Sequence, residues 1–318
     1  MKNAIEIRGL RKSYGDVDAV RGVDLTVAAG EVFALLGPNG AGKTTIVEIL
    51  EGYRKRDAGD ASVLGFDPGT AGPDFKARIG IVLQSTGIDP YLTVAETVAL
   101  YSGYYPHPRP VDEVVELVGL AEKHDERVLR LSGGQQRRLD VAIALAGDPE
   151  LLFLDEPTTG FDPSARRGAW EIVKSLAALG KTVLLTTHYM DEAQYLADRV
   201  AVIAGGKFVA EGSPATLAGR DAEDTWIRFR LPAGAEPPPQ VASQQPEAGG
   251  YLAVATEDPT GDLHALTGWA LDHGYRLEAL EVLRPSLEDV YLELTGAPGD
   301  DARTEHAASS GRQRRRRR

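Results

Sequence analysis

The chain has 318 residues, of which 42% are hydrophobic, and its formal net charge is −12. That length allows one large buried core and a small second domain. The net charge becomes −18 once the six arginines of residues 312–318 are set aside. The rest of the chain is therefore strongly acidic and would repel phosphate backbones, so we expect no nucleic acid as a partner. Cysteine is absent from the sequence, which excludes disulfides, thiolate metal sites and thiol nucleophiles.

The first half of the chain predicts strands and helices in alternation. Ile5 and Ile7 alternate with polar neighbours, as in a half-buried strand. Residues 31–36 are almost continuously apolar, which is typical of a strand covered on both faces of a parallel sheet. A glycine-rich loop follows, and residues 43–50 then predict a helix. Residues 79–83 indicate a short strand, and two helices are predicted over 93–105 and 111–118, separated by a proline-rich break.

The alternation continues beyond residue 130. Ser132 is a suitable N-cap for a helix that extends to Ala146. A strand over 151–155, a helix over 163–179 and a strand over 182–187 follow. This order predicts an α/β fold with a parallel sheet built from βαβ units, and segment 88–140 is expected as a helical subdomain beside it. Arg137 and Arg138 are expected on the surface of their helix.

The composition changes after residue 219. Segments 225–230, 251–255 and 276–283, with a helix over 260–272, indicate a small α+β domain over 220–296. Inside it, residues 232–250 are rich in proline and poor in apolar side chains, so they are expected to form a loop. Residues 297–318 lack apolar content and end in arginines, so they are expected to be disordered. The sequence contains no run of about 18 apolar residues, so we expect no membrane-spanning helix.

The loop between the predicted strand at 31–36 and the predicted helix at 43–50 reads GPNGAGKTT. Such a loop can direct successive backbone N–H groups at phosphates, and the helix that follows adds the positive end of its dipole. Lys43 is expected to reach the β- and γ-phosphates of ATP, and the Thr44 hydroxyl to bind Mg²⁺. The residues expected to bind the nucleotide are Gly37, Pro38, Asn39, Gly40, Ala41, Gly42, Lys43, Thr44 and Thr45.

Two adjacent carboxylates, Asp155 and Glu156, end the apolar strand at 151–155. Strand ends of this kind meet at the edge of an open α/β sheet where ligands bind. Asp155 fits the role of a Mg²⁺ ligand, and Glu156 is the candidate base for an attacking water. An unperturbed glutamate has a pKa of about 4.3, so positioning the water matters more than taking its proton. A solvated acidic turn before Pro157 is the simpler alternative.

A third segment, Ser132-Gly133-Gly134-Gln135, lies between these two motifs. By itself it is either a flexible linker or a helix N-terminus that binds an anion. With its position in the chain it resembles the signature of the ATP-binding cassette (ABC) family, and the resemblance covers residues 1–216. It implies a P-loop NTPase core that uses ATP and Mg²⁺. It also implies a homodimer in which Ser132 and Gly134 contact the γ-phosphate held by the opposite subunit.

The same resemblance implies roles for single residues. Gln84 would touch Mg²⁺ and face a membrane partner, and His188 would contact the γ-phosphate. Tyr14 would stack on adenine, and Asp162 would be the aspartate of the family's D-loop, where Phe161 replaces a frequent leucine. Taken alone, Gln84 is a strand-end amide, His188 a structural histidine and Tyr14 a half-buried aromatic residue of a strand.

Residues 285–296 are similar to the closing segment of ATP-binding subunits from drug exporters of the daunorubicin-resistance type. The resemblance implies a cytoplasmic subunit, peripheral on the inner face of the membrane, that powers export through an integral-membrane permease on a separate chain. One alternative is a non-transport ABC ATPase that acts on ribosomes or DNA. Another is a P-loop kinase, which would not explain residues 131–135.

Overall fold

The computed structural model describes residues 2–82, 87–217, 225–232, 234–239, 241 and 249–283. It divides the chain into two compact units, Met1–Leu217 and Ala218–Arg318, close to the boundary predicted at residue 219. Gln84, the segment 285–296, the tail 297–318 and part of the loop 232–250 lie outside the described residues. None of the helices in the described ranges combines the length and the apolar character of a membrane span.

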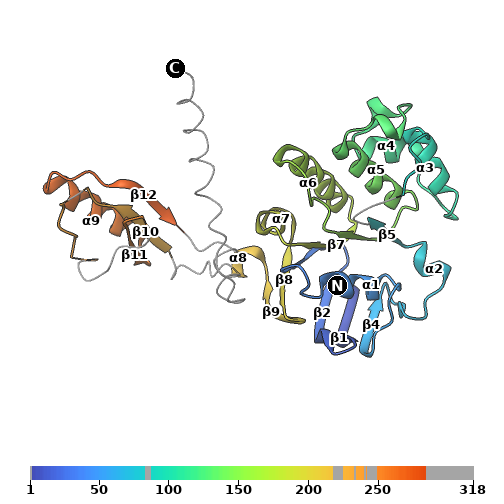
Figure 1. Cartoon of the computed structure of the whole chain (residues 1–318), viewed down its shortest axis with the longest axis horizontal. Coiled ribbons are helices and arrows are strands. Elements are labelled where there is room, and N and C mark those ends of the chain that lie inside the picture. The colour runs from blue at the N-terminus through green and yellow to red at the C-terminus, as the bar shows by residue number, and fades with distance from the viewer. Residues whose placement is uncertain are drawn as a thin grey trace, which may run out of the picture. The chain divides into compact units, whose positions relative to one another are not determined.

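A six-stranded sheet forms the centre of the first unit (Figure 1). In spatial order its strands are β5 (Ile79–Val82), β6 (Leu151–Asp155), β7 (Thr182–Thr187), β3 (Val32–Leu36), β8 (Arg199–Ala204) and β9 (Lys207–Gly212). The first five strands are parallel and β9 is antiparallel, which confirms the predicted parallel sheet. Every residue of β3 and β7 is buried, as expected for strands covered on both faces.

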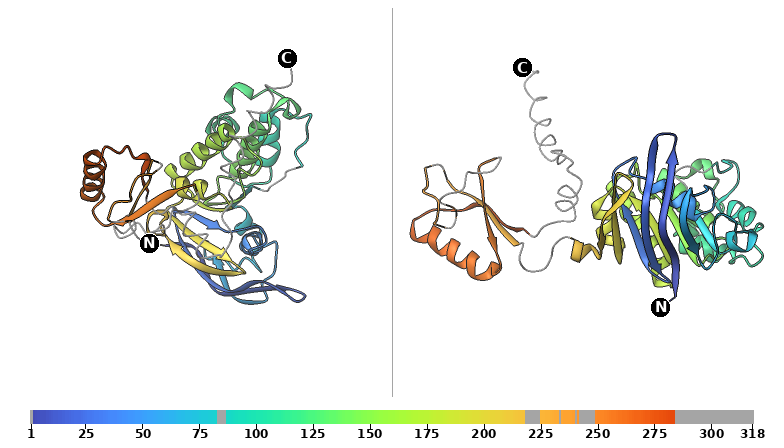
Figure 2. Two further views of the ribbon diagram at one scale, coloured as in Figure 1. Left: turned by 60° about the vertical axis from the view of Figure 1, so that its left-hand side comes forward. Right: turned by 90° about the horizontal axis from the view of Figure 1, so that it is seen from below.

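A second sheet, which is antiparallel, lies beside the first and was not predicted beyond its first strand. Its order is β2 (Val17–Ala28), β1 (Asn3–Tyr14) and β4 (Ala58–Val63). Figure 2 shows β1 and β2 as a long two-stranded ribbon. The helix α1 (Lys43–Leu50) places Ile46, Ile49 and Leu50 in one apolar core with side chains of both sheets. Burial from two sides therefore holds the helix that follows the glycine-rich loop.

The helices α3 (Val94–Ser102), α4 (Val111–Leu117) and α5 (Gly133–Leu145) form a group away from the antiparallel sheet (Figure 1). Thr93 and Ser132 begin α3 and α5 with capping boxes, in which each hydroxyl accepts from the backbone N–H three residues on. The remaining helices of this unit are α2 (Pro73–Lys76), α6 (Pro163–Ala178), α7 (Met190–Leu196) and α8 (Pro214–Leu217), with short 3-10 turns at Ala121–Lys123 and Val128–Arg130.

The prediction that Arg137 lies on the surface is wrong. Its side chain is buried between α5 and the segment after β6, where Nε donates to the carbonyl oxygen of Pro157 at 3.1 Å. The guanidinium also pairs with Asp140, 3.4 Å away on the next turn of α5. Arg138 is half-buried, and its guanidinium donates to the carbonyl oxygen of Gly119 at 3.4 Å.

The second unit is a small α+β fold. Its sheet has the order β11 (Tyr251–Thr256), β10 (Thr225–Arg230) and β12 (Glu278–Leu283), and all its pairings are antiparallel. The helix α9 (Pro259–Asp272) packs on this sheet (Figure 2). Ile227 and Phe229 of β10 form the core of the unit with Leu252 and Leu266.

Candidate active site

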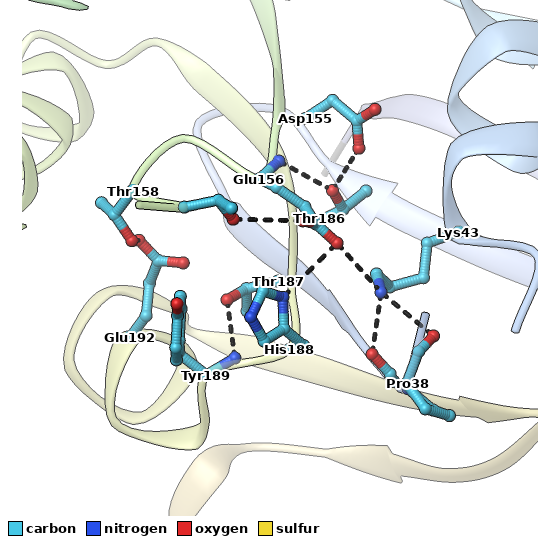
Figure 3. Close-up of polar contacts among 12 residues, drawn as sticks. Pro38, Lys43, Asp155, Glu156, Thr158, Thr186, Thr187, His188, Tyr189 and Glu192 are labelled. Carbon is cyan, nitrogen blue, oxygen red and sulfur yellow. Dashed lines mark hydrogen bonds and ion pairs between the residues drawn. The ribbon is translucent and has the colours of Figure 1, made fainter. Parts of the chain in front are cut away.

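Three segments meet at the carboxyl edge of the six-stranded sheet (Figure 3). They are the loop after β3, the residues Asp155 and Glu156 at the end of β6, and His188 after β7. The three strands are neighbours in the order β6-β7-β3, so their carboxyl ends lie side by side. The sheet order, rather than nearness in the sequence, brings these side chains together.

The loop after β3 requires glycine at two positions. Gly42 has a φ of 108°, and a Cβ there would lie 2.4 Å from the carbonyl oxygen of Ala19. A Cβ on Gly37 would lie 2.4 Å from the carbonyl oxygen of Ile203. Neighbouring backbone therefore presses on the loop from two sides, and only residues without a side chain fit. The helix α1 starts directly afterwards at Lys43.

Lys43 is the central cation of the site. Its side chain is 4% exposed, and Nζ donates to the carbonyl oxygens of Gly37 at 2.8 Å and Pro38 at 3.2 Å. Nζ also lies 3.3 Å from Oε1 of Glu156 (Figure 3). The ammonium therefore lies under the loop and connects it to the carboxylate that ends β6.

Glu156 adopts a left-handed backbone conformation, with φ 47°, which is unusual for a residue with a side chain. Its backbone N–H donates to both the carbonyl oxygen and the hydroxyl of Thr186, at 3.2 and 3.0 Å. The Thr159 hydroxyl donates to Oε2 at 3.1 Å, and Nδ1 of His188 lies 3.5 Å from Oε1. Strained conformations of this kind persist where surrounding contacts hold them, and they gather at functional sites.

Opposing effects act on the pKa of the Glu156 carboxyl. Burial raises this pKa, but the ammonium of Lys43, the Thr159 hydroxyl and His188 outweigh burial, so the pKa lies below its ordinary value. The carboxylate is consequently ionised at neutral pH. A more acidic carboxylate is a weaker base, so the geometry favours orienting a water molecule over taking its proton.

The oxygen groups beside the loop fit Mg²⁺. Asp155 is half-buried and accepts a hydrogen bond from the Thr186 hydroxyl at 2.5 Å, which orients its carboxylate. Thr44 is exposed in the first turn of α1. Within the described ranges no group of three or more His, Cys, Asp or Glu side chains gathers as a metal cage. Mg²⁺ typically takes only one or two protein ligands and completes its shell with phosphates and water, so a carboxylate and a hydroxyl fit it.

A cavity of about 320 Å³ lies over the loop, a volume within the usual range of small-molecule sites. It brings together most of the predicted loop residues and Glu156. The residues that line it are Ala19, Asn39, Gly40, Gly42, Lys43, Thr44, Thr45 and Glu156.

The predicted signature residues lie elsewhere. Ser132 and Gly134 begin α5 and line a different cavity of about 340 Å³ between α5 and α6, together with Gln135 and Asp162. Gly133 is exposed at the same helix end. Asp162 caps α6, because its Oδ1 accepts from the backbone N–H of Ala165 at 2.8 Å. Within one chain, therefore, the signature segment and the glycine-rich loop line separate cavities.

Tyr14 ends β1 and is 40% exposed as a residue. The guanidinium of Arg54 lies 5.1 Å from the ring centroid, and Nζ of Lys12 lies 5.6 Å from it. An exposed ring beside two cations offers a face on which a nucleobase could stack.

The threonines that form hydrogen bonds to Asp155 and Glu156 were not predicted from the sequence. Thr186 orients Asp155 and accepts the backbone N–H of Glu156, and Thr159 donates to the Glu156 carboxylate. The available signal was the pair Thr186-Thr187, which ends a buried strand just before His188.

Comparison with known proteins identifies the family. The family model described as "ABC transporter" matches residues 20–159, and one described as "ABC transporter domain-containing protein-like, C-terminal domain" matches residues 225–286. The chain is 43% identical over 306 residues to the Nod factor export ATP-binding protein I of Rhizobium sp. (strain N33), covering 93% of this chain and 98% of the relative. The chain belongs to the ABC transporter family. This ABC protein is also 39% identical over 323 residues to the daunorubicin/doxorubicin resistance ATP-binding protein DrrA of Streptomyces peucetius, covering 96% of each.

Solved structures agree with this assignment. An ATP-binding cassette of an ABC transporter in its ADP conformation is 26% identical, with a TM-score of 0.60 over 67% of this chain and 92% of that one. A dimeric ATP-binding cassette in a post-hydrolysis state, bound to ADP and Pi, is 26% identical, with a TM-score of 0.58 over 66% of this chain and 98% of that one. The protein is therefore an ABC ATPase with a P-loop NTPase core. This confirms the predicted family, fold and ATPase activity.

Proposed function

We propose that this ABC ATPase pairs with a second copy of itself and drives export through a membrane permease on a separate chain. The substrate class proposed is a drug-like or hydrophobic compound, because relatives that match nearly the whole chain are named for Nod factor export and for daunorubicin resistance. The subunit would lie in the cytoplasm against the inner face of the membrane, with residues 220–296 as an accessory unit.

One observation supports dimerisation above all. Lys43 and Glu156 line the cavity over the loop, whereas Ser132 and Gly134 line another cavity of the same chain. A helix N-terminus with two glycines suits an anion, and it would complete the phosphate site of a second copy. A relative with the same fold is dimeric in its solved structure.

In the mechanism we infer, Lys43 exchanges its contacts with the Gly37 and Pro38 carbonyls for the β- and γ-phosphates of ATP. Thr44 and Asp155 would hold Mg²⁺, whose positive charge neutralises phosphate oxygens when it is bound. Gln84 would add to this set, and it lies outside the described residues.

The ionised carboxylate of Glu156 would then accept a hydrogen bond from the attacking water and align it with the γ-phosphate. His188, 3.5 Å from the same carboxylate, would contact the γ-phosphate. Tyr14 would stack on the adenine. Asp162 would be the aspartate of the D-loop, the loop that leads into α6.

The substitution Glu156→Gln tests the catalytic assignment. It keeps the side chain's shape but removes the charge, so we expect ATP binding to persist while hydrolysis falls by roughly 10²–10⁴-fold. Nucleotide-bound dimer should then accumulate in light scattering after size exclusion. Exposed Glu116 provides the control variant Glu116→Gln, which should behave as wild type. Full ATPase activity of Glu156→Gln would remove Glu156 from this role.

Dilution tests the dimer. If each site needs residues from two chains, specific ATPase activity should fall as the concentration drops below that at which dimers form. Undiminished turnover by a monomer would contradict the proposal.

The transport role predicts that the tagged chain co-purifies with an integral-membrane protein. Co-sedimentation with ribosomes or DNA in place of membranes would favour a non-transport ABC ATPase.

A further inference from the structure

The ring of Tyr189 lies against the ring of His188. Their centroids are 4.1 Å apart, and the ring planes are tilted by 40°. The backbone N–H of Tyr189 donates to the Thr187 hydroxyl at 2.9 Å, which holds the start of this segment (Figure 3). Tyr189 is half-buried just before α7, so its ring is confined by its neighbours.

Arg166, in the first turn of α6, contacts the same ring. Its guanidinium carbon lies 4.1 Å from the Tyr189 centroid, and its side chain is only 20% exposed. The guanidinium also pairs with Asp191 at 3.3 Å. Its backbone N–H donates to the carbonyl oxygen of Asp162 at 3.0 Å. A partly desolvated cation on an aromatic face is a favourable contact, so α6 and the segment after β7 are held together here.

His188 itself has few directional contacts. Its Nδ1 is buried and makes no hydrogen bond within the described part of the chain, although the Glu156 carboxylate lies 3.5 Å away. A hydrogen bond at Nδ1 would fix the angle of the imidazole, and without one the packing of a neighbouring ring contributes more to that angle. Tyr189 supplies a ring that packs against His188.

We propose that Tyr189 is a positioning residue for His188, and that Arg166 holds Tyr189 in place. The inference rests on the proposed role of His188 at the γ-phosphate. The path runs from the loop that contains Asp162 through Arg166 and Tyr189 to the histidine beside Glu156. These contacts connect the loop at the start of α6 with the histidine beside Glu156.

Kinetics test the inference. Tyr189→Leu removes the ring, and we expect kcat for ATP hydrolysis to fall about tenfold with KM changed less than about twofold, which corresponds to about 1.4 kcal/mol in the transition state. Tyr189→Phe keeps the ring and should retain kcat. Arg166→Gln removes the cation and should lower kcat less than Tyr189→Leu does.

A matched control exists on the same two helices. Lys174 of α6 lies with Nζ 3.7 Å from the ring centroid of Tyr195 on α7, and neither residue contacts the ring of His188 in the described part of the chain. Tyr195→Leu also removes a contact between α6 and α7, but it should leave kcat unchanged. An equal loss of kcat in Tyr189→Leu and Tyr195→Leu would mean that only packing of α6 on α7 matters, and it would overturn the inference.

A spectroscopic measurement follows the position of His188 directly. The nearby Tyr189 ring should shift the ring-proton resonance of His188 in histidine-labelled protein, with the signal assigned from the His188→Ala variant. We expect this shift in wild type and in Tyr189→Phe, and its loss in Tyr189→Leu. An unchanged His188 resonance in Tyr189→Leu would overturn the inference.

The same variants separate this inference from the proposed function. Full activity of His188→Ala would refute the role of His188 and the inference with it. Impaired His188→Ala beside fully active Tyr189→Leu would refute the positioning role alone.

Discussion

Glu51 is a buried carboxyl at the C-terminal end of α1, and its titration should control the stability of the first unit. The residue is the C-cap that follows α1 and is 4% exposed. Burial, together with the negative charges of Asp155 and Glu48, raises its pKa from 4.5 to about 8. Replacing it with glutamine removes the titration while keeping a polar side chain of nearly the same shape.

The sign of the effect follows from where the proton is held. Between pH 4.5 and about 8, folded protein keeps a proton on Glu51 that the unfolded chain has released. The free energy of unfolding therefore falls as pH rises through this window and levels off above it. A shift of this size corresponds to at most about 5 kcal/mol, since one pKa unit is about 1.36 kcal/mol. Local relaxation and water penetration reduce the penalty of a buried charge, so we expect about 2–3 kcal/mol.

Urea denaturation of nucleotide-free and Mg²⁺-free protein provides the assay. Trp170 is the one tryptophan of the first unit, so substitution of Trp226 and Trp269 by Phe makes fluorescence report this unit alone. At pH 5 wild type and Glu51→Gln should have similar midpoints. At pH 8.5 the variant should be more stable by about 2–3 kcal/mol, whereas the exposed control Glu116→Gln should follow wild type at both values. Parallel pH profiles for wild type and Glu51→Gln would refute the reasoning.

Two further variants test the loop. Lys43→Ala removes the cation that we place at the β- and γ-phosphates, so ATP affinity measured by titration calorimetry should fall by roughly 100-fold or more; unchanged affinity would contradict the loop assignment. Gly42→Ala forces a side chain onto a φ of 108° and into the Ala19 carbonyl oxygen at 2.4 Å. We expect it to lower both thermal stability and ATP binding, with a backbone strain of about 1–3 kcal/mol. Gly40 also has a positive φ, 80°, but a Cβ there meets no atom within 4 Å, so Gly40→Ala should be milder; the reverse order would refute the contact argument.

The local features of this protein could be predicted from the sequence. The run GPNGAGKTT begins right after an apolar strand and before a helix, and both elements form where the pattern places them. Ser132 caps α5 as predicted, because a hydroxyl three residues before a free backbone N–H is a local arrangement. Burial of β3 and β7 follows from continuous apolar runs. These properties depend on a few consecutive residues, so their signal is present in the chain itself.

Tertiary structure decided which of these features meet. The order β6-β7-β3 places Glu156 between Lys43 and His188, and the left-handed backbone of Glu156 directs its carboxylate at both. The burial of Arg137 depends on the carbonyl of Pro157, which follows a different strand. Contacts between distant segments depend on strand order and helix packing, and periodicity along a single segment contains no information about either.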